Sequence, residues 1–182
     1  MMSVRPFILG AACLALIACA PPPEDPMPVN KTLSVEAGPN VNQYNNSANS
    51  IVVRLYQLSS RTEFEAASFW DIFNDNSPDL AGVVLDKRSL SPLYPGETRL
   101  VAFDLEPDVF YLGAFAEFAD YSTQKFRAAV PIDAERLDNG VTVSVTSSGI
   151  SIQFRNPSDA GEEAESPRRR FGFLSKLFGG GE

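Results

Sequence analysis

The stretch VTVSVTSSGISIQFR, residues 141–155, decides the fold class. Valine alternates with threonine and serine over 141–146, and apolar residues alternate with polar ones over 150–155. A period of two places every apolar side chain on the same face of a strand. Between the two halves, Gly149 can adopt the positive φ that a tight turn requires. The stretch is therefore predicted to form a β-hairpin with one buried and one solvated face.

Strand-like segments recur along most of the chain before this hairpin. Residues 50–58 (SIVVRLYQL) are β-branched and aromatic, and residues 109–118 (VFYLGAFAEF) are apolar on both alternations, as in a central strand covered on two sides. Further strands are predicted at 33–37, 87–93, 98–104 and 125–131. Eight short strands, with turn signals such as Pro95-Gly96 between them, predict a mainly β sandwich of two sheets.

One segment departs from the period of two. Thr62-Glu-Phe-Glu65 fits a capping box, and the aromatic residues Phe69, Trp70 and Phe73 follow at helical spacing. A helix over residues 62–74 is therefore expected to lie across the sandwich. An aromatic stripe at this spacing is more often core than binding site, so Trp70 is expected to be buried.

The first residues have the composition of a secretory signal peptide. Arg5 precedes an apolar run over residues 7–18, which is too short to span a bilayer as a helix. The run ends in Leu16-Ile-Ala-Cys19, which resembles the bacterial lipobox, in which the cysteine is lipidated and becomes the first residue after cleavage. Cys13 lies deeper in the run, with Gly10 three positions upstream in place of a branched residue. Cys19 is therefore predicted to carry a lipid anchor.

The position after the cysteine bears on the destination of the protein. Ala20 stands where an aspartate would retain a lipoprotein at the inner membrane, so resemblance to lipoprotein sorting implies the periplasmic face of the outer membrane. Several buried acyl chains, at about 0.8 kcal/mol per CH₂, make such attachment effectively permanent.

Composition divides the chain into four parts. A signal peptide at 1–18 precedes a lipidated, proline-rich stalk at 19–29, because proline favours extended backbone. The sandwich domain is predicted at 30–156. Residues 157–182 form a predicted flexible tail whose basic end, RRRFGFLSKLF, is amphipathic; two interpretations of it remain open, a disordered tail and a contact with membrane or partner.

Charge and composition exclude several classes of function. The formal net charge is −8 and no dense basic stripe is present, which argues against nucleic acid as a partner. No histidine occurs, so Ser-His catalysis is excluded and the commonest metal ligand is missing. Residues 75–86 have the alternating oxygens of a calcium loop, but Leu80 occupies the position where that loop needs glycine. No catalytic residue, metal, cofactor or small-molecule substrate is predicted.

An ordered set of short motifs resembles the TssJ (VasD) lipoproteins of the type VI secretion system. The strand 50–58 is followed by Phe64 and by FWDIF at 69–73, and then by the turn Tyr94-Pro-Gly-Glu-Thr98. The segment 112–120 and the pair Phe126-Arg127 complete the set, although Ala119 stands where the family usually has arginine and Phe126 where it has tryptophan. The resemblance covers about residues 33–155.

The resemblance implies a transthyretin-like, two-sheet antiparallel β-sandwich with a helical excursion after the second strand. It also implies a non-enzymatic tether, which binds the periplasmic C-terminal region of the inner-membrane protein TssM through the loop between the first two strands. That loop is PNVNQYNNSAN, residues 39–49, which has five asparagines and no charge. The residues expected to form the contact are Asn40, Val41, Asn42, Gln43, Tyr44, Asn45 and Asn46.

Two alternatives stand beside the tether. A periplasmic carbohydrate-binding lipoprotein of sandwich fold would present exposed aromatic residues on a concave surface. An enzyme would bring carboxylates together in a cleft with perturbed pKa values.

Within the loop at residues 39–49, Tyr44 is the expected anchor of a protein contact, because a tyrosine buries a large area at low entropic cost.

Overall fold

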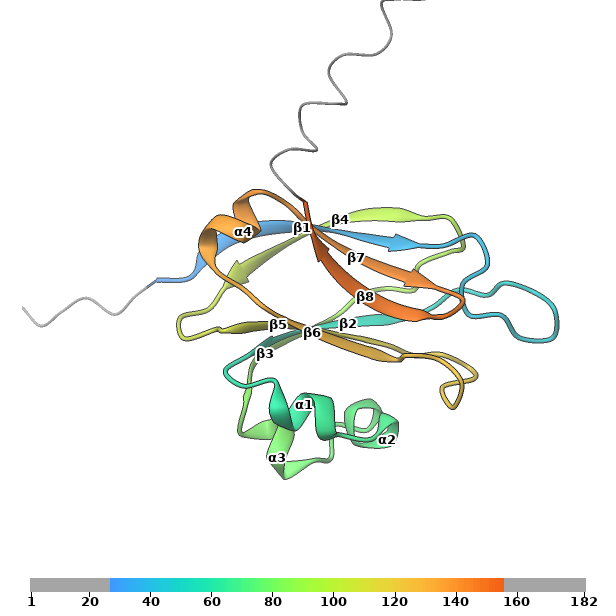
Figure 1. Ribbon diagram of the computed structural model, residues 1–182, viewed down its shortest axis with the longest axis horizontal. Coiled ribbons are helices and arrows are strands. Elements are labelled where there is room, and N and C mark those ends of the chain that lie inside the picture. Colours follow the sequence, from blue (N-terminus) through green and yellow to red (C-terminus); the bar gives the residue numbers. More distant parts are fainter. Residues whose placement is uncertain (1–26, 156–182) are drawn as a thin grey trace, which may run out of the picture.

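Eight strands form two packed sheets in the computed structural model, which describes residues 27–155 (Figure 1). The predicted signal peptide, Cys19, most of the predicted stalk and the predicted tail at 157–182 lie outside the described residues. The mainly β prediction is confirmed, and the eight strands fall in or beside the predicted segments.

The first sheet combines the beginning and the end of the domain. Its order is β4-β1-β7-β8. The strands are β1 (Val29–Ala37), β4 (Thr98–Leu105), β7 (Val141–Thr146) and β8 (Gly149–Phe154). β1 runs antiparallel to β4 but parallel to β7, which is an exception to the predicted antiparallel pairing. A parallel pair needs a long connection, and nearly the whole domain separates these two strands in sequence.

The second sheet has the order β3-β2-β5-β6, with all neighbours antiparallel. Its strands are β2 (Val53–Leu58), β3 (Val84–Ser89), β5 (Tyr111–Ala116) and β6 (Arg127–Pro131). β5 is buried on both faces, as its continuous apolar pattern predicted. β3 begins before the predicted segment 87–93, because Leu90 and Leu93 are buried in the connection that follows the strand rather than in the strand itself.

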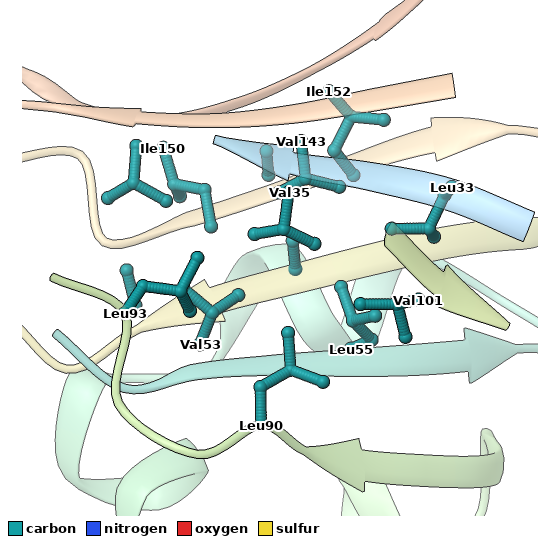
Figure 2. Packing of buried hydrophobic residues seen from close by; sticks show 14 of the residues in the cluster. Leu33, Val35, Val53, Leu55, Leu90, Leu93, Val101, Val143, Ile150 and Ile152 are labelled. Carbon is teal, nitrogen blue, oxygen red and sulfur yellow. The ribbon is translucent and has the colours of Figure 1, made fainter. Parts of the chain in front are cut away.

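Two apolar clusters hold the layers together. The larger one fills the space between the sheets, where Val35 and Val143 of the first sheet face Val53 and Leu55 of the second (Figure 2). The smaller one lies between the second sheet and the helices, around Phe64, Phe69, Ile72 and Phe115. Each large side chain buried in this way contributes about 1.5–3 kcal/mol.

Three short helices between β2 and β3 cover the outer face of the second sheet (Figure 1). They are α1 (Thr62–Ala66), α2 (Phe69–Phe73) and α3 (Pro78–Ala81), and a fourth, α4 (Ala134–Asp138), lies between β6 and β7. The predicted helical excursion is confirmed, but the prediction of one continuous helix over 62–74 is wrong, because Ala67 and Ser68 are extended.

The break follows from a second capping box, formed by Ser68 and Asp71. Ser68 Oγ accepts a hydrogen bond from Asp71 N, and the Asp71 carboxylate accepts one from Ser68 N. At the predicted box, Arg61 is the N-cap residue of α1 and makes no side-chain capping bond. The restart at Ser68 changes which residues face the sheet, so Phe69 and Ile72 are buried while Trp70 is 50% exposed. The predicted burial of Trp70 is therefore wrong.

Candidate functional site

The loop between β1 and β2, residues 39–49, stands at one end of the sandwich (Figure 1). Val41 is fully buried in the larger core cluster, and the Val41 carbonyl accepts a hydrogen bond from Asn49 N at 3.2 Å. The loop is therefore attached to the core at Val41, and the residues that follow Asn42 project from that point.

Asn42 holds the base of the loop through both atoms of its amide. Its Nδ2 donates to the Ser50 carbonyl at 2.9 Å, and its Oδ1 accepts from Ala119 N, at the exit of β5, at 2.8 Å. The side chain is only 8% exposed and its φ is 48°, a value that asparagine tolerates better than most residues. Asn42 thereby ties the loop to a segment 77 positions away in sequence.

The tip of the loop is a tight turn. Tyr44 N donates to the Ser47 carbonyl at 2.9 Å, and Ser47 N donates back to the Tyr44 carbonyl at 3.1 Å. Asn45 and Asn46, between them, both have positive φ, at 52° and 59°, as a type I′ turn requires. The asparagine-rich composition therefore serves backbone geometry, and the tip has a defined shape before any partner arrives.

The exposed residues of the loop border an open depression of about 490 Å³. Its wall consists of Gln43, Tyr44, Asn45, Asn46, Ala119 and Asp120. Tyr44 is 59% exposed, which leaves its ring available for contact. The hydroxyls of Ser122 and Thr123 donate to the Asp120 carboxylate and lower its pKa, so this carboxylate is ionised at neutral pH.

Arg54 of β2 fixes the position of α2 next to this end of the sandwich. Its guanidinium donates to the carbonyls of Ile72 and Phe73 at the end of the helix, and it forms an ion pair with Glu117 at 2.6 Å. It also lies over the Phe73 ring. The last carbonyls of a helix lack the usual intrahelical partners, and the half-buried Arg54 side chain donates to two of them.

Arg127 of β6 acts in the same way on α1. Its guanidinium donates to the backbone carbonyls of Glu65 and Ala67, near the end of that helix. The pair Phe126-Arg127, singled out above by resemblance, therefore has a structural role in the contact between helix and sheet. Sequence reasoning did not assign this role, because the acceptors lie about 60 positions upstream.

The predicted contact residues fall into two groups. Asn40, Gln43, Tyr44, Asn45 and Asn46 are exposed, whereas Val41 and Asn42 are buried and hold the loop in place. Ala119 and Asp120 were not predicted as site residues. Only the contact across the fold from Asn42 to Ala119 brings them beside the loop.

In the calcium-loop candidate at residues 75–86, which follows α2, the first carboxylate, that of Asp75, is engaged in ion pairs. Asp75 pairs with Lys87 at 2.7 Å and with Arg54 at 3.5 Å, and Leu80 is buried in α3. Within residues 27–155, no three histidine, cysteine or acidic side chains gather in a way that would hold a metal ion. No helix in this described range is long and apolar enough to cross a membrane.

Comparison with known families gives one match. A family model described as "Type VI secretion lipoprotein, VasD, EvfM, TssJ" matches residues 30–148, more than half of the chain. A comparison with curated protein sequences finds no match.

Solved structures show the same fold at low sequence identity. The T6SS lipoprotein TssJ1 from Pseudomonas aeruginosa is 23% identical, with a TM-score of 0.61, over 71% of this chain and 98% of that one. Serratia marcescens Lip, a membrane-bound component of the type VI secretion system, is 22% identical, with a TM-score of 0.60, over 70% and 98%. A chain of the structure described as the T6SS protein TssM C-terminal domain from EAEC is 21% identical, with a TM-score of 0.55, over 70% and 98%.

Proposed function

Because this chain belongs to the type VI secretion lipoprotein family of VasD, EvfM and TssJ, we propose that it tethers the type VI secretion membrane complex to the outer membrane. In this proposal the lipid is attached to Cys19, and the β1–β2 loop binds the periplasmic C-terminal region of a TssM-like inner-membrane protein.

The observation that carries the proposal is the pre-shaped, uncharged loop. Its tip is a type I′ turn, its base is held by Asn42, and Tyr44 is exposed beside a depression. A loop that is already ordered loses little conformational entropy on binding, and amide groups are desolvated at lower cost than ions. Both properties suit a protein–protein contact.

The choice of partner is supported by the structural neighbours. A chain that shares this fold occurs in the solved structure described as the TssM C-terminal domain, and another occurs in a type VI membrane complex. The family is a structural secretion-system lipoprotein rather than a known class of enzyme. The proposal therefore assigns a tethering role and no reaction.

Calorimetry with the mature chain, solubilised in detergent, tests the proposal. The titrant is the periplasmic C-terminal region of the TssM-like protein from the same organism. We expect saturable one-to-one binding that Tyr44→Ala weakens by about tenfold or more, as for an aromatic hot spot. Phe110→Ala is the matched control, since Phe110 is also an exposed aromatic (58%) but adjoins Leu58, at the other end of β2 from the loop.

Each outcome has a separate meaning. Binding that Tyr44→Ala leaves unchanged would keep the partner and remove this loop tip from the contact. Absence of binding at high micromolar concentration would contradict the tether and favour the carbohydrate-binding lipoprotein, which a titration with soluble glycans would then examine.

A further inference from the structure

Trp70 is the only tryptophan of the chain, and half of its surface lies in solvent. Tryptophan is, with tyrosine and arginine, one of the residue types enriched among the energetic centres of protein interfaces. Trp70 lies on the helical layer, outside the β1–β2 loop that carries the proposed function.

The Trp70 side chain is held in one orientation. Its Nε1 donates to the Tyr121 hydroxyl at 3.1 Å, and its ring meets the rings of Phe69, Phe73 and Tyr121 edge-on, with centroids 5.3–5.5 Å apart. Arg54 fixes the helix beneath it through the carbonyls of α2. A side chain ordered in this way pays little entropy when a partner covers it.

Sequence neighbours and hydrogen bonds connect Trp70 to the β1–β2 loop, beginning with the bond from Trp70 to Tyr121. Tyr121 directly follows Asp120, which lines the depression together with Tyr44, and Ala119 is bonded to Asn42. The loop, the connection from β5 to β6 and α2 lie toward the same end of the molecule (Figure 1). A segment that contacts Tyr44 therefore reaches Trp70 by crossing Asp120.

Charge indicates the chemistry of that segment. The loop has no charged residue, and Asp120 is the single charge on the wall of the depression. Within the described residues no lysine or arginine forms a salt bridge with Asp120, whose hydrogen-bond donors are hydroxyls. A basic side chain complements such a carboxylate, and arginine in addition stacks on aromatic rings.

We propose that the docking surface extends from the β1–β2 loop across Asp120 to Trp70, and that it receives a basic segment of the partner. An arginine of that segment pairs with Asp120, and the segment covers the exposed part of Trp70. The inference rests on the proposed function, since it takes the TssM-like periplasmic region as the occupant.

A fluorine label on the tryptophan side chain tests, without a mutation, whether the docking surface extends to Trp70. 5-Fluorotryptophan incorporated into the full mature chain gives one ¹⁹F resonance, because Trp70 is the only tryptophan. We expect that resonance to shift on addition of the unlabelled TssM-like region, and to become less accessible to a paramagnetic quencher. A resonance unchanged at saturation would overturn the proposal while leaving the binding itself established.

Variants measure the two contacts separately. We expect Trp70→Ala to weaken binding by about tenfold, and Asp120→Asn to slow association and to reduce its dependence on salt. The two hydroxyls donate to different oxygens of Asp120, and asparagine keeps one acceptor oxygen for one of them and offers its amide Nδ2 as a donor to the oxygen of the other hydroxyl. Phe110→Ala is again the control, and binding by Trp70→Ala equal to that of Phe110→Ala would overturn the proposal.

The outcomes separate the two hypotheses. Binding that is sensitive to Tyr44→Ala but insensitive at Trp70 and Asp120 leaves the proposed function intact and rejects the extended surface. Absence of binding by the unmodified chain rejects both. A ¹⁹F shift caused by soluble glycans, with none caused by the TssM-like region, would also overturn the proposal.

Discussion

Asn42 and Ala119 are joined by a hydrogen bond of 2.8 Å from the Ala119 amide to the Asn42 side chain, across 77 positions of sequence. This bond connects the two loops that border the depression. The shape of the proposed docking surface therefore depends on one buried amide in the left-handed region of φ.

Replacing Asn42 should loosen the loop and destabilise the domain. Asn42→Ala removes two buried hydrogen bonds and disfavours φ of 48°, so we expect a loss of about 2–3 kcal/mol in the free energy of unfolding. Asn42→Gly restores the backbone freedom, so its loss should be smaller by about 1 kcal/mol. Urea denaturation measures both, and equal losses would assign the whole effect to the side-chain bonds.

Two substitutions of Asn46, in the turn at the tip of the loop, should affect stability differently. Asn46→Gly places the preferred residue of a type I′ turn at φ of 59°, so stability should hold or rise slightly. Asn46→Val should cost about 1–2 kcal/mol, because a β-branched residue is strained in that region. Thermal unfolding of both variants, checked against Ala48→Val outside the turn, tests the turn type; equal melting temperatures would contradict it.

Replacing Gly149 and replacing Gly96, two glycines of positive φ, should cost very different amounts of stability. A Cβ on Gly149 would lie 2.6 Å from the Lys125 carbonyl oxygen, whereas a Cβ on Gly96 would meet nothing within 4 Å. We expect Gly149→Ala to cost about 3 kcal/mol or more, since backbone must move, and Gly96→Ala only about 1 kcal/mol of strain. Comparable losses in chemical denaturation would show that β8 can shift away from Lys125.

Tyr56 should make the domain sensitive to alkali. Its side chain is 2% exposed, and burial raises the pKa of its hydroxyl to about 12, partly opposed by the Arg54 charge. In the unfolded chain this hydroxyl loses its proton near pH 10. The contribution of the protonated Tyr56 hydroxyl to the free energy of unfolding is therefore complete below pH 10 and is lost as the pH rises toward 12. The free energy of unfolding, measured by urea denaturation between pH 9 and 11.5, should decline by about 2 kcal/mol less in Tyr56→Phe than in the unmodified chain. The same decline in both proteins would contradict the assignment to Tyr56.

The lipid anchor gives a prediction with an internal control. Cys19→Ser should move the protein from the membrane fraction to the soluble periplasmic fraction, because the thiol that accepts the lipid is gone. Cys13→Ser should leave the protein in the membrane fraction, since Cys13 lies inside the predicted signal peptide. Membrane retention of the Cys19 variant, followed by immunoblotting, would argue for an attachment other than the lipid.

Local patterns predicted most strands, because side-chain alternation depends only on which face of a strand is buried. The hairpin of β7 and β8 is confirmed, with Val141, Val143 and Val145 buried. The parallel pairing of β1 with β7 had no local signal, since it depends on which distant strand fills the neighbouring position. Asn42 was recognised in the loop, but its bond to Ala119 exists only in the folded chain.

Trp70 illustrates a prediction that failed for a definable reason. Two capping patterns compete in the segment, Thr62-Glu-Phe-Glu65 and Ser68-Phe-Trp-Asp71, and only the second forms. A helix that restarts at Ser68 turns a different face toward the sheet than a continuous helix would. The signal was present at Ser68 and Asp71, but the longer aromatic periodicity took precedence over it.

The central position of β1 gives the domain a mechanical property. β1 is hydrogen-bonded on one side to β4 and on the other to β7, and its first residue, Val29, is on the side of the chain that leads to Cys19. Hydrogen bonds between strands run across the strand direction, so a pull along β1 loads both rows in shear, all bonds together, instead of opening them one after another. Force that enters at the proposed anchor would pass along β1, which is paired on both sides over residues 34–36, into the β1–β2 loop.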